Sequence, residues 1–253
     1  RYVQKRLELM EREVAAREGS ALHEAAELYR DRFRHMREHY GCEAGRLLLE
    51  GFARLQQRGC VEILTTAATH TLLPLLATPE ALHAQVEQGC RSYEKHFGRP
   101  PGGLWLPECA WAEQVEQPLR DSGIHYFFLE SHGLLLADPK PAHGVFAPIV
   151  TPAGLAAFAR DVQSSRQVWS AQEGYPGDFE YREFFRDLGY DADYQYIRPY
   201  LNPAGMRHYL GIKYYRVTGH CPMDQKRPYR PGRARERAAE HAEHFVSERR
   251  RQA

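Results

Sequence analysis

The fold is decided by the stretch Leu104-Trp105-Leu106-Pro107-Glu108-Cys109-Ala110-Trp111. Gly102-Gly103 leads into this apolar run, and Pro107 allows little further sheet pairing beyond it. The stretch predicts a buried strand whose carboxyl end delivers Glu108 to an edge lined by aromatic surface. A lone acid in such a place is as typical of a surface residue or a helix N-cap partner, so the rest of the chain decides its role.

The segments around this stretch alternate between strand and helix patterns. Apolar runs at 61–65, 104–106 and 125–129 predict strands. Between them, the pattern predicts a helix that opens at Pro79-Glu80 and a short helix over 113–120. Continuous apolar strands that alternate with helices are typical of a parallel sheet covered on both faces. We therefore predict an α/β fold built on a parallel sheet.

Candidate catalytic groups follow each of the three predicted strands. His70 comes after the first strand, Glu108 after the second, and Glu130 and His132 after the third. The carboxyl ends of parallel strands meet at one edge, where the active sites of such folds gather. Any one of these groups alone is more often structural, but three at successive strand ends favour a functional site.

The remaining elements are expected from their periodicity and turn residues. Helices are expected over 1–20, 22–40 and from Leu48 to near Gly59. From Asp138 onward we expect, in chain order, a hairpin of strands 145–150 and 155–160 inserted between barrel units, a strand at Gln167–Ser170, a helix from Asp178 to about Leu188, a strand-like segment at 213–218, a loop at 227–237 and a helix at 234–248.

Composition excludes several classes of partner. Lys and Arg number 34 against 33 Asp and Glu, which gives no electrostatic reason to expect nucleic acid or an acidic membrane. No apolar run approaches the ~20 residues that a membrane span needs.

The five cysteines are scattered without metal-ligand spacing, which fits a reducing cytoplasm. The chain begins at Arg1 in what reads as the middle of a helix, so we expect a piece of a longer protein.

A carboxylate beside tryptophans at the mouth of a parallel sheet fits sugar chemistry. Sugar rings stack their C–H faces on indole, and the Glu108 carboxylate is able to attack or stabilise an oxocarbenium-like centre. A retaining mechanism needs a second carboxyl about 5–5.5 Å away. His70 is suited to hydrogen-bond a sugar hydroxyl or to tune the carboxyl pair. Trp111 and Trp169 are the candidate stacking surfaces, although a single tryptophan is by default a core residue.

Two other chemistries remain open at this point. His70, His132 and an acid form a candidate metal site of the kind found in deacetylase-like barrels, but no two of them share a short ligand spacing. Cys109 is a candidate nucleophile, but no helix N-terminus or neighbouring base is evident, and a buried small hydrophobe is the simpler reading. We expect neither a metal nor a cofactor.

Several of these segments resemble glycoside hydrolase family 57. The segment Thr65–His70 with Leu72–Leu76 resembles the second signature region of the family, and 104–111 resembles the third. The segments Phe158-Ala159-Arg160-Asp161, Gln167-Val168-Trp169-Ser170 and Gly174-Tyr175-Pro176-Gly177 are similar to the α-1,4-glucan branching enzymes of the family. The resemblance runs from about residue 20 to 248.

The resemblance implies an incomplete (β/α)7 barrel, truncated at both ends and carrying helical and hairpin insertions. Residues 1–58 would be a helical insertion and 59–253 the central part of the catalytic barrel. It also implies a retaining double displacement that moves an α-1,4-glucan chain to a 6-hydroxyl, as in glycogen and α-glucan metabolism. Glu108 falls on the nucleophile, His70 on the active-site histidine and Trp169 near the donor site.

The implied substrate contacts and the departures from the family pattern complete this reading. His132 and Asp161 lie in matching segments and are expected only as substrate contacts. Nothing here matches the family's His-x-Pro strand or its acid/base aspartate, and the segment Pro139–Pro148 holds Phe146 where branching members carry a loop tyrosine. General acid help is worth ~10²–10⁴-fold, so this chain alone is expected to be inactive. The alternatives are a 4-α-glucanotransferase or amylase of the family, or a non-catalytic glucan-binding remnant.

Overall fold

The computed structural model describes residues 2–41 and 47–252 of the chain. These residues divide into two units, one formed by Arg1–Arg46 with Ser164–Ala253 and the other by Leu47–Gln163. Each unit has its own core of buried apolar side chains. The predicted assignment of 1–58 to a helical insertion and 59–253 to the barrel runs across both units and stays a prediction.

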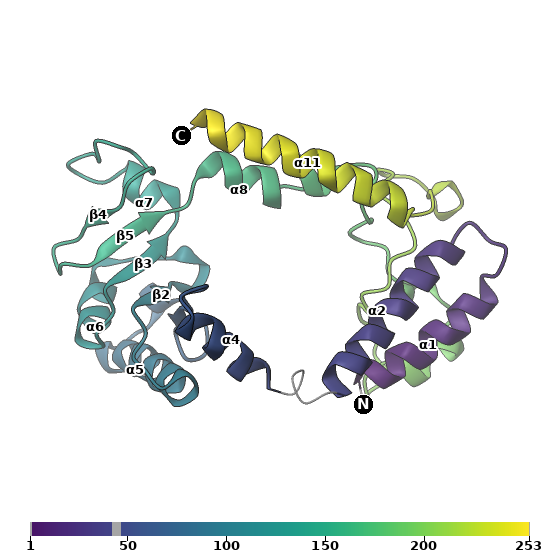
Figure 1. Cartoon of the computed structure of the whole chain (residues 1–253), viewed down its shortest axis with the longest axis horizontal. Helices are drawn as coiled ribbons and strands as arrows, with labels where there is room; N and C mark the ends of the chain where they lie inside the picture. The colour runs from purple at the N-terminus through teal and green to yellow at the C-terminus, as the bar shows by residue number, and fades with distance from the viewer. Residues whose placement is uncertain (1, 42–46, 253) are drawn as a thin grey trace. The chain divides into compact units, whose positions relative to one another are not determined.

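A five-stranded sheet forms the centre of the second unit (Figure 1). Its strands lie in the order β1-β2-β3-β5-β4 and span Thr65–Thr66, Gly103–Trp105, Tyr126–Leu129, Ala156–Ala159 and Ile149–Val150. The first four strands in this order are parallel, and β4 is antiparallel to its neighbour. Over the described residues the sheet does not close on itself, as expected for an incomplete barrel.

Helices of different lengths precede and connect the strands of this unit. They are α4 (Leu48–Gln57), η1 (Leu73–Leu75), α5 (Pro79–Phe97), η2 (Pro107–Cys109), η3 (Glu113–Val115), α6 (Glu116–Asp121) and α7 (Ser131–Leu135), and α8 (Val162–Trp169) follows β5. The helix predicted from Pro79 is confirmed. The Thr78 hydroxyl accepts from the amide of Ala81 at 3.2 Å, Pro79 stands in the first turn, and Gly98 ends the helix with φ 68°.

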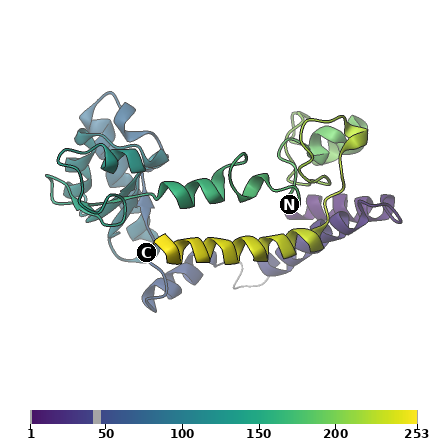
Figure 2. The same cartoon turned by 90° about the horizontal axis from the view of Figure 1, so that it is seen from above.

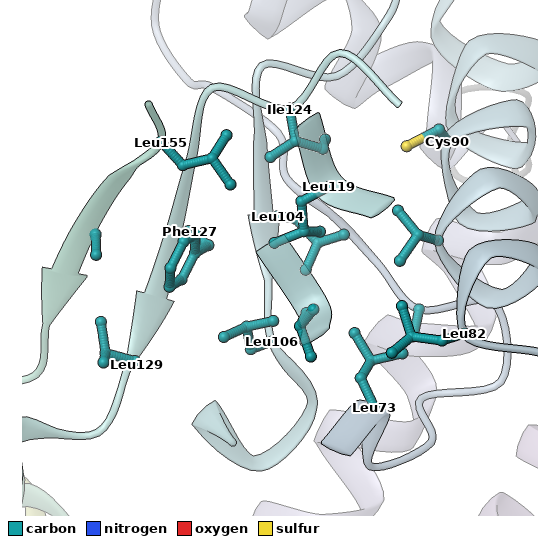
Figure 3. Packing of buried hydrophobic residues seen from close by; sticks show 14 of the residues in the cluster. Leu73, Leu82, Cys90, Leu104, Leu106, Leu119, Ile124, Phe127, Leu129 and Leu155 are labelled. Atoms are coloured by element: carbon teal, nitrogen blue, oxygen red, sulfur yellow. The ribbon is translucent and has the colours of Figure 1, made fainter. Parts of the chain in front are cut away.

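One face of the sheet carries the core of the unit. Successive side chains of a strand point to opposite faces, so Phe127 and Leu129 share a face. Figure 3 shows these two side chains with Leu104, in one cluster with Leu82 and Cys90 of α5. Phe127 and Leu104 are fully buried, which makes this face the one that the helices cover.

The predicted hairpin is present, but its second strand has a larger role than we expected. β4 and β5 are antiparallel and joined by a turn in which the amide of Gly154 donates to the carbonyl of Thr151 at 2.8 Å. β5 also pairs in parallel with β3 over its whole length. It is therefore a strand of the main sheet rather than part of an insertion, and it adds a fourth strand end to the candidate site.

The first unit is built mainly from helices and loops (Figure 2). Its elements are α1 (Tyr2–Ala16), α2 (His23–Gly41), η4 (Tyr175–Gly177), α9 (Leu188–Asp191), α10 (Tyr194–Ile197), η5 (Arg198–Tyr200), η6 (Met223–Gln225) and α11 (Pro231–Gln252). The helices α1 and α2 pack side by side. The buried carboxylate of Glu13 accepts hydrogen bonds from the hydroxyls of Tyr196 at 2.6 Å and Tyr214 at 2.8 Å. Among the described residues, no helix has the length and apolarity that crossing a bilayer requires.

Two predicted elements of this region are wrong. The strand expected at Gln167–Ser170 is the end of α8, because the polar run before Val168 offers no alternating pattern and closes helical hydrogen bonds instead. In place of the helix expected from Asp178 there is an irregular segment of turns and bends with an isolated bridge from Arg182 to Arg216. It pairs with 215–217 through hydrogen bonds from Glu183 to Tyr215 and from Val217 to Tyr181, so tertiary pairing overrides the local cap signal.

Three further boundaries differ from the predictions. Of the strand expected at 61–65 only its end pairs, as β1, while the amide of Ile63 donates to the side chain of Gln56. The strand-like segment at 213–218 makes isolated bridges rather than a strand. The loop expected at 227–237 gives way at Pro231, which opens α11 because proline is tolerated in the first turn.

Candidate active site

The side chains of His70 and Glu108 meet at the carboxyl ends of neighbouring strands. The imidazole Nε2 lies 3.8 Å from the carboxylate Oε1, and the two side chains are 50% and 73% exposed. β1 and β2 pair in parallel, which sets the loop that carries His70 beside the turn that carries Glu108. Two residues far apart in the chain are thus held together at an accessible edge of the sheet.

Both residues stand in a backbone conformation that side chains usually avoid. His70 has φ 54°, Glu108 has φ 55° and the adjacent Cys109 has φ 54°. Over the described part of the chain these are the only non-glycine residues with positive φ. Such strain costs of order 1–3 kcal/mol per residue and is concentrated at functional sites. The concentration of strain at this edge is an independent indication of a site.

The other nitrogen of His70, Nδ1, contacts a neighbouring side chain. Its Nδ1 lies 3.2 Å from the hydroxyl of Thr66, and that hydroxyl donates to the carbonyl of Trp105 at 2.8 Å. The loop between them is tied to α5, because Gln85 accepts from both the amide and the hydroxyl of Thr69. The ring of His70 is therefore oriented through Nδ1, and the loop that carries it is anchored to α5. Sequence reasoning missed Thr66, and its place in the matching segment beside His70 was the available signal.

Glu130, a candidate from the sequence, is engaged in structural contacts. Its carboxylate accepts from the amide and hydroxyl of Ser131 at the start of α7 and forms an ion pair with Arg160 at 3.1 Å. Burial raises the pKa of the neighbouring Cys109 thiol, and Arg160 only partly opposes that rise. A buried thiol with a raised pKa is a poor nucleophile, so the structure disfavours the Cys109 alternative.

Aromatic rings cover the face of the sheet opposite the core. Trp105 and Phe158 both pack against Phe128, with ring centroids 5.9 Å and 5.6 Å away, and Tyr126 packs edge-on against the last two. Trp105 remains 36% exposed and lies in β2, whose carboxyl end carries Glu108. Flat apolar rings beside an exposed carboxylate form a surface on which sugar rings can stack.

Trp111 and His132 lie together, but not with Glu108. Both line a cavity of about 870 Å³ whose walls include Phe127, Leu129 and the segment 136–141. Neither His70 nor Glu108 lines this cavity. Because Phe127 and Leu129 point to the core face, the cavity lies on that side of the sheet. A role of these two residues in substrate binding stays a prediction.

Asp161 and Trp169 lie beyond the end of β5. Asp161 directly precedes α8 and is half-buried. Trp169 ends α8, is 78% exposed and belongs to the first unit. Their proposed contacts with substrate stay predictions. Within residues 2–41 and 47–252, no three His, Cys, Asp or Glu side chains are grouped so as to hold a metal ion.

The comparisons with known proteins concern the family and the fold of the chain. The profile described as glycosyl hydrolase family 57 matches residues 21–248. The curated 1,4-alpha-glucan branching enzyme of Thermococcus kodakarensis is 33% identical, over 97% of this chain and 37% of its own length. A probable 1,4-alpha-glucan branching enzyme of Mycobacterium tuberculosis is 34% identical, over 80% of this chain and 33% of its own length. The chain thus spans about a third of the length of these curated relatives.

A solved structure resembles the whole chain. It is the alpha-amylase AmyC of Thermotoga maritima, with a TM-score of 0.89 and 42% identity over 100% of this chain and 49% of that one. The branching enzyme of Pyrococcus horikoshii gives a TM-score of 0.78 and 35% identity, over 97% of this chain and 44% of that one. These similarities confirm the α/β fold of an incomplete barrel that was predicted from the sequence.

Proposed function

Because the chain belongs to glycosyl hydrolase family 57, we propose that it carries the nucleophile of a 1,4-α-glucan branching enzyme. The observation that supports this proposal is the pair of His70 and Glu108, exposed and 3.8 Å apart at neighbouring strand ends. The curated relatives reported above carry the names 1,4-alpha-glucan branching enzyme and probable 1,4-alpha-glucan branching enzyme, which favours this activity over other reactions of the family. The substrate is then an α-1,4-glucan, and no nucleic acid or membrane is involved.

In the proposed reaction a carboxylate oxygen of Glu108 attacks the anomeric carbon of the donor chain. The glycosidic C–O bond breaks, and the leaving 4-oxygen takes up a proton from a general acid that we assign to no residue of this chain. The 6-hydroxyl of an acceptor chain then attacks the same carbon and gives its proton to the conjugate base of that acid, while the bond from the carbon to Glu108 breaks. Two displacements at one carbon retain the α configuration.

The surroundings of Glu108 fit a long, polymeric substrate. The carboxylate is exposed rather than enclosed, so a glucan chain can reach it from solvent. The ring of Trp105 and its aromatic neighbours offer an apolar floor at the same strand end. We propose that His70 binds a hydroxyl of the sugar next to the broken bond. Trp111, His132, Asp161 and Trp169 are further proposed substrate contacts.

An α-amylase of the same family is the second candidate. The similarity of the whole chain to the structure named alpha-amylase AmyC favours it. The products separate the two activities, because a branching enzyme creates α-1,6 linkages that a debranching enzyme reopens, whereas an amylase lowers the chain length and releases reducing ends. Longer α-1,4 chains would instead identify a 4-α-glucanotransferase. Binding of amylose without turnover would identify a non-catalytic glucan-binding protein.

The nucleophile is tested with a 2-fluoroglucosyl fluoride of α configuration. Fluoride leaves without protonation, so trapping of the glycosyl-enzyme does not depend on a general acid. We expect mass spectrometry to find the added 2-fluoroglucosyl group on the peptide that contains Glu108. In Glu108→Gln we expect labelling to fall by on the order of 10⁶-fold, as for the loss of a catalytic serine nucleophile. The matched control is Glu113→Gln, in the following helix η3, which should label like the unchanged chain. A label on any other residue would refute the assignment.

The wider setting of the proposal follows from its substrate. Branching of α-1,4-glucan belongs to the building of glycogen-like polymers, so we propose a place in α-glucan metabolism. The scattered thiols fit the reducing cytoplasm, which we propose as the location. We keep the assignment of 59–253 to the central catalytic barrel and of 1–58 to a helical insertion as part of the same proposal.

A further inference from the structure

We propose that Thr66 is a positioning residue that fixes the tautomer of His70, so that the proton of the neutral imidazole sits on Nδ1 and the lone pair on Nε2. The inference rests on the proposed function only for its consequence in catalysis. Its evidence is the chain of contacts from the carbonyl of Trp105 through the hydroxyl of Thr66 to the ring of His70.

The Thr66 hydroxyl has a single proton to donate. A carbonyl oxygen can only accept, so the 2.8 Å contact to the carbonyl of Trp105 uses the single proton of that hydroxyl. Toward His70 the Thr66 oxygen therefore has only lone pairs to offer. The contact to Nδ1 at 3.2 Å is a hydrogen bond only when Nδ1 carries a proton.

The backbone of the sheet holds the Thr66 hydroxyl in place for these two contacts. Thr66 and Trp105 are paired residues of β1 and β2, so their positions follow from the register of the sheet. On the other side, the hydroxyl of Thr65 donates to the carbonyl of Gly89 in α5 at 2.9 Å. The amide of His70 donates to the carbonyl of Ala67 at 2.9 Å, which closes the turn that presents the ring. The donor and acceptor pattern is thus set by the fold.

The consequence falls on Nε2, the nitrogen that faces Glu108. A neutral ring with its proton on Nδ1 presents a bare lone pair at Nε2, and this lone pair accepts a hydrogen bond from a sugar hydroxyl or a water. The 3.8 Å between Nε2 and Oε1 of Glu108 is too long for a direct hydrogen bond, which leaves both atoms free to contact the same substrate. His70 can donate from Nε2 only as the imidazolium ion.

The tautomer of His70 with its proton on Nδ1 can be recognised, because free histidine in water favours the opposite tautomer, with the proton on Nε2. Removal of the Thr66 hydroxyl should therefore let His70 revert toward that form. Thr66→Ser keeps a hydroxyl in place, while Thr66→Val keeps the shape of the side chain and removes the hydrogen bonds. Thr69→Val is the matched control, because the Thr69 hydroxyl contacts Gln85 rather than the ring.

The test is nitrogen NMR of the full chain labelled with ¹⁵N-histidine, at about pH 8.5, where an ordinary imidazole is neutral. Long-range ¹H–¹⁵N spectra distinguish a protonated from an unprotonated ring nitrogen, and loss of a signal set in His70→Gln assigns it among the 13 histidines. We expect Nδ1 of His70 to be protonated in the unchanged chain, in Thr66→Ser and in Thr69→Val. In Thr66→Val we expect the protonated signal to move to Nε2.

Either of two results would overturn the proposal. One is a proton on Nε2 of His70 in the unchanged chain, which decides the matter even if Thr66→Val does not fold. The other is a folded Thr66→Val whose His70 keeps its proton on Nδ1. The NMR samples contain no glucan. A result against the Thr66 proposal is therefore distinct from a result against the branching function, which the fluoroglucosyl label tests separately.

Discussion

His70 and Glu108 share a left-handed backbone conformation, with φ of 54° and 55°, and their side chains meet at 3.8 Å. The backbone of each residue is strained in the conformation that brings its side chain to this position. This strain should lower the free energy of unfolding of the chain. The relation predicts that stability and activity are opposed at both residues.

The strain at Glu108 is tested by Glu108→Asn. Asparagine tolerates the left-handed region better than glutamate, so we expect the free energy of unfolding to rise by about 1 kcal/mol. Labelling by the fluoroglucosyl reagent should be lost at the same time. The control is Glu94→Asn on the exposed side of α5, where the poorer helix propensity should cost a few tenths of a kcal/mol. A destabilised Glu108→Asn would show that the backbone there is not strained.

The close approach of α5 to β1 is tested at Gly89. A Cβ built there would lie 2.1 Å from the carbonyl oxygen of Thr66, so Gly89→Ala must push the helix away from the strand. We expect a loss of about 2 kcal/mol, in the range of overpacked cores, together with slower labelling of Glu108.

The matched control for this change is Gly51→Ala, in the helix α4. A Cβ at Gly51 meets nothing within 4 Å, so alanine should stabilise that helix by roughly 0.5–1 kcal/mol. Calorimetric melting temperatures of the two variants should move in opposite directions. Equal shifts would mean that the contact of Gly89 with Thr66 does not constrain the packing of α5.

The ion pair of Glu183 and Lys226 predicts a dependence of stability on pH. The two atoms lie 2.7 Å apart, and the side chains are only 10% and 8% exposed. Burial raises the pKa of Glu183, but the hydrogen bond and charge of Lys226 outweigh it and hold that pKa below its ordinary value. A lowered folded-state pKa means that the pair stabilises the chain above the unfolded pKa of about 4.3, and that this stabilisation is lost as the pH falls through the folded value.

We expect Glu183→Gln to cost about 3 kcal/mol near neutral pH, because it leaves the buried charge of Lys226 without a counter-charge, with the carbonyl of Gly219 still accepting from it. Urea unfolding should show this cost shrinking as the pH falls from the unfolded pKa of about 4.3 through the lowered folded value, because the carboxylate then becomes protonated in the unchanged chain as well. The control is Glu87→Gln, which breaks an exposed pair with Arg91 and should cost less than about 0.5 kcal/mol. A cost that does not change with pH would contradict the linkage.

The reactivity of the thiols is predicted from their burial. Burial, followed by the charges of Glu94 and Glu87, raises the pKa of Cys90 to about 11. Only the thiolate is alkylated, so Cys90 should resist iodoacetamide at about pH 8 while the exposed Cys60 reacts. Peptide mapping after brief treatment measures both, and the same treatment in denaturant is the control. Rapid alkylation of Cys90 in the folded chain would mean that α5 detaches from the sheet.

The order of the strands up to β3 could be predicted because its signals are local. Thr78-Pro79 and Gly98 mark both ends of α5, and the apolar runs mark β2 and β3. The short strand predicted at Gln167–Ser170 is wrong. Val168 and Trp169 are residue types that favour strands, but the backbone hydrogen bonds of this segment continue the helix α8. The helix predicted from Asp178 is wrong because the segment that pairs with this part of the chain lies more than thirty residues further along the sequence.

The location of the candidate site at the strand ends could be predicted from the sequence, but the backbone conformation and the contacts of its residues could not. Strand ends point to His70 and Glu108, and the structure brings them together. Their left-handed backbone and the hydrogen bonds of Thr66 depend on how α5 and β2 pack, which no local pattern reports. The same reason explains why Trp111 and His132, close in sequence to the strand ends, line a cavity apart from Glu108.

The two faces of β3 carry different populations of side chains, with Phe127 and Leu129 on one and Tyr126 and Phe128 on the other. A deletion of one residue within this strand would invert every position that follows it. Aliphatic packing partners of α5 would then be set against aromatic rings, and neither layer would fit. Length changes should therefore be tolerated in the segment 136–148 and be lethal to folding between 126 and 129, a contrast that an insertion–deletion scan would display directly.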